Sequence, residues 1–324
     1  MTVAGYIHVG RGFNGLREGD EKRLTHVNFS FAVIKDGLGS VAHWENTGAI
    51  RDFMKNRGPI KAILSVGGWG AGGFSNAVAT KEGREKLTNS LVDIINDYGF
   101  DGIDLDWEYP ANDAAGIDAS PNDTVNYTLW VELIREKIGP NKILSMAAGA
   151  GKIYADALEI NKLVPLMDFF NIMTYDMCPW NETGYHTSLY PSEICNNRSG
   201  SESMKVFFDA GIPKEKLVLG AAFYGRIYKD VDGLGKKAAT PPGFTGGYVK
   251  TMEMVQEAGG YLYDEKAEAP YAYNEKEKIF ITFENERSLK AKVQYVKDQQ
   301  FLGIMFWEYM CDDENSTLLK AIKQ

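Results

Sequence analysis

The stretch Asp101-Gly102-Ile103-Asp104-Leu105-Asp106-Trp107-Glu108 alternates apolar and acidic residues. Successive side chains of a β-strand point to opposite faces, so Asp104, Asp106 and Glu108 share one face and the apolar residues share the other. An apolar face is typical of a strand that packs against helices. We therefore expect the three carboxyl groups to face the interior of a barrel of strands.

Three carboxyl groups so close together cannot all be ionised at low cost. Because charges are poorly solvated inside a barrel, the three acids must share protons or bind a cation. A shared proton raises at least one pKa, which makes the outermost acid, Glu108, a candidate general acid at neutral pH. Two alternatives stay open at this point, a Mg²⁺ or Ca²⁺ site and a buried structural network. The strict alternation disfavours a third, a solvated acidic face.

Apolar, β-branched runs followed by helix-like segments recur along the chain. The runs begin near Val3, Thr25, Lys61, Gly102, Lys142, Asp168, Lys216 and Gly303. Short runs that are apolar on both faces are typical of parallel strands covered on both sides. Apolar spacing and end signals predict helices over 81–98, 123–138 and 286–299. The pattern predicts an α/β fold, a (β/α)8 TIM barrel, whose chemistry lies at the C-terminal ends of the strands.

One interval breaks this rhythm. The last two strand starts, Lys216 and Gly303, are 87 residues apart, whereas the earlier starts are 22 to 48 apart. Glycine-rich turns and the runs 261–263 and 278–281 predict antiparallel strands in the surplus. We expect a barrel formed by residues 1–226 and 286–324, with a small α+β insertion domain, 227–285, between strand seven and strand eight.

The composition limits the classes of partner. The 324 residues include 35 Lys and Arg and 44 Asp and Glu, a net charge of −9, which argues against nucleic acid and anionic membranes as partners. No signal peptide is visible, so localisation is left open: extracellular if the chain is a processed form acting on a polymer, otherwise cytoplasmic. We expect the three cysteines, Cys178, Cys195 and Cys311, to be free thiols, with one bridged pair as the alternative.

The acidic stretch and four other segments resemble the motifs of a known family. Asp101 to Glu108 resembles the DGxDxDxE signature of glycoside hydrolase family 18, which contains chitinases, chitin-binding lectins and some endo-β-N-acetylglucosaminidases. Further segments resemble family motifs on other strands: Ser65-Val66-Gly67-Gly68, Met173-Thr174-Tyr175-Asp176, Phe223-Tyr224-Gly225-Arg226 and Phe306-Trp307. The resemblance runs from Tyr6 to Trp307, and the insertion is similar to the one found in the chitinase branch.

The resemblance implies a set of catalytic roles. Glu108 would protonate the glycosidic oxygen, and the carbonyl oxygen of the substrate's own N-acetyl group would attack the anomeric carbon, with no protein nucleophile. Asp106 would bind both Glu108 and the acetamido N–H. Asp104 would share a proton with Asp106 and tune its pKa. Tyr175 would donate its hydroxyl to the acetamido oxygen.

The resemblance also implies a substrate-binding set on the strand ends and the loops above them. Aromatic rings would stack on sugar faces, with Trp307 as the floor of the cleavage site. Met146 and Met173 would shape the pocket for the N-acetyl methyl group. The predicted set consists of Tyr6, Phe31, Trp69, Met146, Met173, Asp176, Trp180, Tyr224, Arg226 and Trp307. The remaining tryptophans, Trp44, Trp107 and Trp130, are expected in the core.

These features predict a chitinase that hydrolyses β-1,4-linked N-acetylglucosamine with retention. The alternatives are a hydrolase of a related glycan, such as peptidoglycan or the N-glycan core, an inactive chitin-binding lectin, and, more remotely, a metal-dependent barrel enzyme. We expect a monomer whose partners are chitin or N-acetylglucosamine oligosaccharides, with no cofactor and no metal. The four histidines show no metal-ligand spacing.

Overall fold

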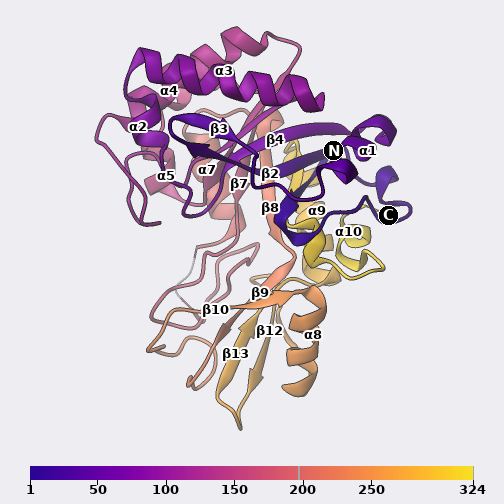
Figure 1. Cartoon of the computed structure of the whole chain (residues 1–324). Coiled ribbons are helices and arrows are strands. Elements are labelled where there is room, and N and C mark those ends of the chain that lie inside the picture. The colour runs from indigo at the N-terminus through magenta and orange to yellow at the C-terminus, as the bar shows by residue number, and fades with distance from the viewer. Residues whose placement is uncertain (196–197, 324) are drawn as a thin grey trace.

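The computed structural model describes residues 1–195 and 198–323. Eight parallel strands form a closed barrel, which confirms the predicted (β/α)8 architecture (Figure 1). Around the barrel the strands follow the order β1, β14, β8, β7, β6, β5, β4 and β2, and β1 pairs with β2 to close the ring. Their bounds are β1 Thr2–His8, β2 His26–Lys35, β4 Lys61–Gly67, β5 Gly102–Asp106, β6 Ile143–Gly149, β7 Phe169–Met173, β8 Leu217–Ala222 and β14 Gly303–Trp307.

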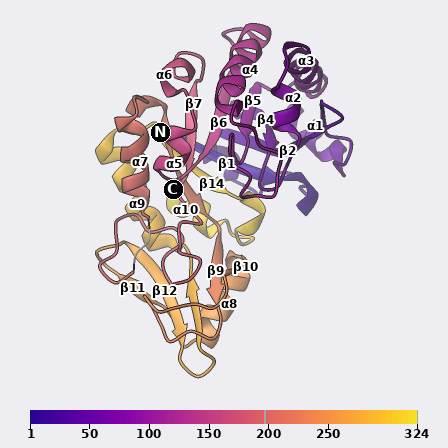
Figure 2. The ribbon, with the colours of Figure 1, turned by 90° about the vertical axis from the view of Figure 1, so that its left-hand side faces the viewer.

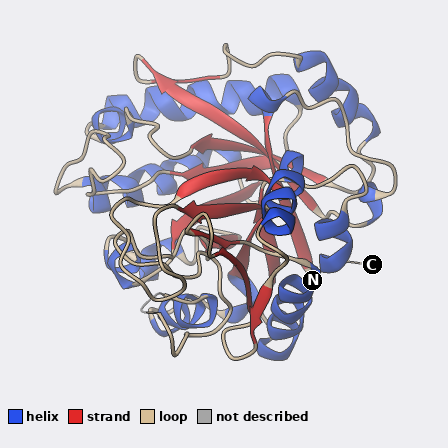
Figure 3. Cartoon of the chain, turned by 90° about the horizontal axis from the view of Figure 1, so that it is seen from below, coloured by secondary structure: helices blue, strands red, loops and turns tan. Residues whose placement is uncertain are grey.

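Helices surround the barrel (Figure 3). Three of them, α3 Lys81–Tyr98, α4 Asp123–Ile138 and α9 Glu286–Gln299, have the bounds predicted from the sequence. The others are α1 Thr47–Asn56, α2 Phe74–Val78, α5 Lys152–Asp156, α6 Ile160–Leu163, α7 Gly200–Asp209 and α10 Thr317–Ile322. A short strand, β3 Leu38–Ser40, pairs with the end of β2.

Two separate apolar layers stabilise the barrel. The larger layer fills the space between strands and helices and includes Ile103, Leu105 and Trp107 of the acidic stretch, as their alternation predicted. The smaller layer lies inside the barrel and includes Tyr6 and Met173. The alternation of side chains along each strand therefore decides which residues can reach the interior.

A second sheet projects from one end of the barrel (Figures 1 and 2). Five antiparallel strands form it in the order β10, β9, β13, β12 and β11, and one helix accompanies it. The bounds are β9 Tyr224–Tyr228, β10 Gly243–Gly247, α8 Tyr248–Glu257, β11 Leu262–Asp264, β12 Ala269–Asn274 and β13 Ile279–Thr282. The sheet thus begins at Tyr224, and the division at residues 227 and 285 stays a prediction.

Two further features concern the whole chain. Among the described residues, no helix is long and apolar enough to cross a membrane. Cys178 and Cys311 are buried free thiols, and burial raises their pKa values to about 11 and about 12. Such thiols stay protonated and unreactive at neutral pH.

Candidate active site

The three acids lie where strand β5 ends, at the C-terminal mouth of the barrel. Asp104 and Asp106 belong to β5, and Glu108 follows two residues later. Their exposed fractions rise outward, from 0% for Asp104 to 3% for Asp106 and 9% for Glu108. The acidic row therefore runs from the closed barrel interior to the edge of solvent, and Glu108 is the acid of the row nearest to solvent.

Asp104 is the anchor of this row. It accepts four hydrogen bonds: Oδ2 from the hydroxyls of Tyr6 and Ser65, both at 2.8 Å, and Oδ1 from Ser145 at 2.7 Å and the Asn171 amide at 3.2 Å. Burial raises the pKa of Asp104, but these donors oppose the rise because they stabilise the charged form. Four donors converging on one carboxyl group favour its ionised state.

The outer two acids carry the proton of the row. Burial, Glu108 and Asp104 together raise the pKa of Asp106 well above its usual value. Burial also raises the pKa of Glu108 to about 7; a hydrogen bond from Tyr109 opposes this, and the charge of Asp176 adds to it. Glu108 is thus poised to donate and recover a proton near neutral pH. Within the described residues Asp106 Oδ1 is buried without a hydrogen-bond partner, so it can accept one from a ligand.

The hydrogen-bond donors around Asp104 argue against the alternative that the acids bind Mg²⁺ or Ca²⁺. Hydroxyl and amide donors occupy the lone pairs of this carboxylate that a hard cation would need. Among the described residues, no group of three or more His, Cys, Asp or Glu side chains is arranged to hold a metal ion. The acids therefore suit proton transfer better than cation binding.

Two glycines give the end of β4 its close approach to the acids. Gly67 has φ +118° beside β5, and a Cβ there would lie 2.1 Å from the Asp106 carbonyl oxygen. At Gly68 the N–H donates to that same oxygen at 2.8 Å, and a Cβ would overlap the ring of Phe31. The Ser65 to Gly68 motif thus supplies both a donor to Asp104 and the space for Asp106.

Strand β7 brings Met173 and Tyr175 to the interior face, as predicted. Burial and the nearby acids, Asp106 foremost, raise the pKa of Tyr175 well above its usual value, so its hydroxyl stays protonated. That hydroxyl contacts Met305 Sδ at 3.9 Å, a weak acceptor. Tyr175 can therefore redirect its O–H to a ligand oxygen.

Two predicted binding residues lie elsewhere. Met146 belongs to the outer apolar layer, where the Tyr127 hydroxyl donates to its sulfur at 3.6 Å. Its neighbour Ser145 takes the inward position, so the alternation of β6 turns Met146 away from the barrel interior. Tyr6 is 1% exposed and its hydroxyl is bound to Asp104, so it supports the acids from inside the barrel.

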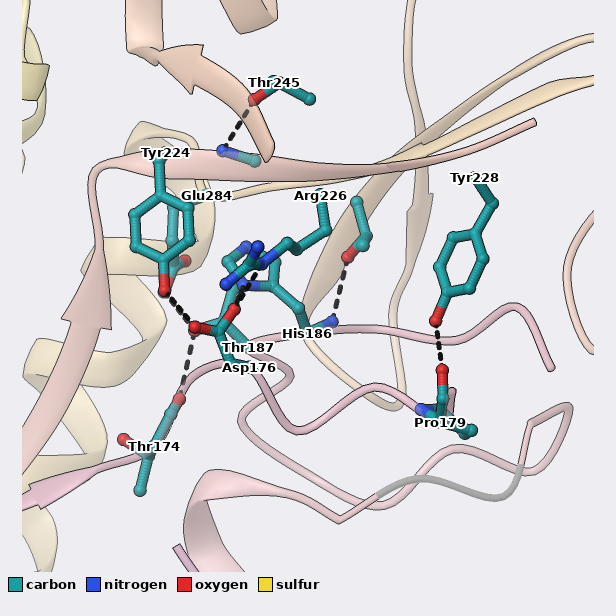
Figure 4. A network of polar contacts seen from close by, with 12 residues as sticks. Thr174, Asp176, Pro179, His186, Thr187, Tyr224, Arg226, Tyr228, Thr245 and Glu284 are labelled. Carbon is teal, nitrogen blue, oxygen red and sulfur yellow. Dashed lines mark hydrogen bonds and ion pairs between the residues drawn. The ribbon is translucent and has the colours of Figure 1, made fainter. Parts of the chain in front are cut away.

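Asp176 follows Tyr175 and joins the barrel to the second sheet (Figure 4). Its Oδ2 accepts a hydrogen bond from the Tyr224 hydroxyl at 2.7 Å, and its Oδ1 accepts one from Arg226 Nε at 2.6 Å. Burial raises its pKa, but His186 and Arg226 outweigh that effect and hold the pKa below its usual range. The side chain remains 40% exposed. Asp176 is therefore a charged acceptor open to a ligand.

Aromatic rings extend the site on either side of the acids. The half-buried Trp307 stacks on Phe31 at 5.4 Å and contacts Tyr6 at 5.9 Å. Trp69 and Trp180 are 61% and 69% exposed, which fits the predicted platforms. In contrast, the tryptophans that were expected in the core are buried there: Trp44, Trp107 and Trp130.

Several residues of the site were not predicted. Ser145 and Asn171 hydrogen-bond to Asp104, and His186 lies beside Asp176. Ser145 and Asn171 could have been found from strand register, because polar residues on the inner face of a barrel need polar partners. His186 sits in a loop, and no periodic signal identifies it.

Comparison with known proteins agrees with this geometry. The family model for glycosyl hydrolases family 18 matches residues 3–312. Chitinase A1 of Niallia circulans is 34% identical over 304 residues, 83% of this chain and 43% of that protein. Chitinase B of Serratia marcescens is 28% identical over 382 residues, 93% of this chain and 76% of that protein.

A solved structure matches along nearly its whole length. It is a glycoside hydrolase family 18 N-acetylglucosaminidase from Paenibacillus barengoltzii, with a TM-score of 0.92 and 36% identity over 99% of this chain and 98% of that one. The chain belongs to glycosyl hydrolase family 18. It spans less than half the length of Chitinase A1.

Proposed function

We propose that this chain is a chitinase that hydrolyses β-1,4-linked N-acetylglucosamine with retention. The observation that carries the proposal is the position of Glu108 at the open end of a row of acids on one strand, where burial raises its pKa to about 7. A row with one acid at its solvent edge suits a reaction whose nucleophile comes from the substrate. Chitinase A1 and Chitinase B, which share the family, are named for chitin hydrolysis.

The first step is cleavage of the glycosidic bond. Glu108 gives its proton to the glycosidic oxygen as the bond to the anomeric carbon breaks. The carbonyl oxygen of the N-acetyl group forms a bond to that carbon and closes a cyclic oxazolinium intermediate. Asp106 accepts a hydrogen bond from the acetamido N–H at its unpartnered Oδ1, and the Tyr175 hydroxyl donates one to the acetamido oxygen.

The second step restores the enzyme. A water molecule attacks the anomeric carbon from the side that the leaving group vacated, and Glu108 takes the proton of that water. The acetamido oxygen leaves the anomeric carbon, so the product keeps its configuration. Asp176 and Arg226 hold sugar hydroxyls during both steps, and Trp307 supports the sugar ring.

Hydrolysis of an oligomer series tests the proposal. The chain should shorten fully N-acetylated oligosaccharides and leave fully deacetylated chitosan intact, whereas Glu108→Gln should bind the oligomers without cleaving them. Binding without hydrolysis by the unaltered chain would instead identify a lectin. Cleavage of peptidoglycan or the N-glycan core, with chitin oligomers left intact, would identify a hydrolase of that related glycan.

A second candidate activity is removal of single N-acetylglucosamine units. The near-complete match to the N-acetylglucosaminidase of Paenibacillus barengoltzii favours it. The two activities differ in their early products, because an endo-acting chitinase releases oligomers of several lengths and an N-acetylglucosaminidase releases the monosaccharide. The product pattern at low conversion from a hexamer distinguishes them.

A further inference from the structure

His186 is a fully buried histidine next to the candidate site. Its exposed fraction is 0%, and neither ring nitrogen has a hydrogen-bond partner among the described residues. Its Nδ1 lies 3.6 Å from Asp176 Oδ1, and its ring packs against that of Tyr224 at 5.2 Å (Figure 4). An unpartnered buried polar group is costly, so the short distance to Asp176 calls for an explanation.

The backbone of His186 is held firmly. Its N–H donates to Thr282 Oγ1 at 3.1 Å, and its carbonyl accepts from the Met177 N–H at 3.0 Å. These bonds connect the loop that carries Asp176 to the end of β13. The backbone of this residue is therefore held beside Asp176, which keeps the ring within reach of that carboxylate.

A buried ion pair contacts the same loop at Thr187, next to His186. The side chains of Lys292 and Glu284 are both 0% exposed and form an ion pair with each other. Thr187 Oγ1 donates to Glu284 Oε1 at 2.9 Å and accepts a hydrogen bond from Lys292 Nζ at 2.6 Å. It also lies 3.2 Å from the Thr174 carbonyl oxygen, which closes the loop on itself. Such an arrangement holds the two ends of the loop at a fixed separation.

The surroundings of His186 indicate which ring nitrogen carries the proton. Burial lowers its pKa, so the neutral ring is favoured. The charged groups that face it are Asp176 from the end of β7, Arg226 from β9 and Glu284 from the end of β13. Arg226 already donates to Asp176 Oδ1, and that oxygen lies 3.6 Å from Nδ1 of His186. A neutral ring with its proton on Nδ1 is the form that can donate there.

We propose that His186 is a positioning residue, whose Nδ1–H closes onto Asp176 Oδ1 when a sugar binds and keeps that carboxylate ionised and correctly oriented. Hydrogen bonds that are long in an unliganded site commonly tighten in the complex. The charge of Asp176 in turn raises the pKa of Glu108. His186 would thus act on the general acid through Asp176 without touching the substrate. The inference rests on the proposed function, because Asp176 is assigned there to sugar binding.

Three substitutions separate this role from simple packing. His186→Phe keeps the ring volume and removes the donor. The amide nitrogen of asparagine takes roughly the place of Nδ1, and that of glutamine the place of Nε2, so His186→Asn and His186→Gln form a matched pair. We expect kcat/KM on an N-acetylglucosamine oligomer to fall about tenfold in the Phe and Gln variants, as for loss of one hydrogen bond to a charged group.

The pH profile supplies a readout that packing alone would not move. Without the donor, the negative charge of Asp176 is less compensated, so the alkaline limb set by Glu108 should move to higher pH in the Phe and Gln variants. His186→Asn should restore part of the rate and return the limb toward that of the unaltered chain. Equal losses in all three variants with an unmoved limb would overturn the proposal.

Nitrogen NMR of the unaltered chain tests the inference independently of hydrolysis and of variant folding. With ¹⁵N-labelled histidine, we expect His186 to be neutral at pH 7 with its proton on Nδ1. A proton on Nε2, or on both nitrogens, would overturn the proposal. If the unaltered chain cleaves no oligomer, the proposed function fails, whereas the tautomer still decides the role of His186.

Discussion

Burial of Glu108 should cost the fold stability at neutral and alkaline pH. The folded chain holds the pKa of this carboxyl at about 7, whereas its ordinary value is 4.5. The folded state therefore binds more protons between these two pH values, so stability falls as pH rises from about 4.5 to about 7 and then stays level. At about 1.36 kcal/mol for each pH unit, the loss amounts to about 3 kcal/mol.

Replacement of the acid by its neutral amide removes this cost. Glu108→Gln should therefore be more stable than the unaltered chain at pH 8, and the difference should vanish near pH 4.5. The unfolding entropy is about 2.1 cal/mol/K per residue, so for 324 residues a stability difference of about 3 kcal/mol corresponds to a rise in Tm of about 4 °C. Thermal unfolding at the two pH values measures the difference.

The same substitution at an exposed glutamate is the control for this experiment. Glu136→Gln, on the exposed side of α4, makes the same chemical change at a residue that is exposed to solvent. It should show no difference between the two pH values. If Glu108→Gln gains no more at pH 8 than at pH 4.5, the environment of Glu108 does not disfavour its charge and the reasoning fails.

Three further predictions follow from the same geometry. The kcat/KM for an N-acetylglucosamine oligomer should fall about fifty-fold between pH 7 and pH 9, because a group with a pKa of about 7 loses that share of its protonated form; a flat alkaline limb would exclude Glu108 as the acid. Tyr175→Phe should lower kcat by about 10²–10³, as for loss of one oxyanion donor, with Tm nearly unchanged; a drop below tenfold in steady-state kinetics would contradict its role. Lys292→Met should lower the free energy of unfolding, measured in urea, by about 3–5 kcal/mol, because it leaves Glu284 buried and unpaired. Adding Glu284→Gln to this variant should recover most of the loss. Equal stability of the single and double variants would refute the pairing.

The barrel could be predicted because its signals are periodic. The alternation around Asp104 and the apolar runs determine which faces are buried, and helix α3 ends before Gly99, a left-handed residue that stops helices. The face of a helix was harder to predict. In α4 the apolar spacing groups Leu129 with Leu133 and Ile134, yet Leu129 is 40% exposed, because Tyr127 and Trp130 occupy the buried face. Large aromatic residues outweighed the simple apolar spacing.

The site could be predicted where residues lie on strands with fixed alternation. Asp106, Glu108 and Tyr175 lie on such strands or directly after them. The predicted role of Met146 in binding was wrong, because the direction of its side chain depends on the register of β6 against β5. That register places Ser145 opposite Asp104. His186 could not be predicted, because its contact with Asp176 depends on a loop folded against a second sheet.

The central claim is that the substrate's own N-acetyl group attacks the anomeric carbon while Glu108 supplies the proton. Aryl chitobiosides that carry acetyl, fluoroacetyl, difluoroacetyl and trifluoroacetyl groups on the reacting sugar test it most directly, because each fluorine makes the carbonyl oxygen a poorer nucleophile. The account predicts that kcat falls steeply with each fluorine and that the first product is the β-anomer. A rate independent of fluorine substitution, or an α-anomer as the first product, would contradict it.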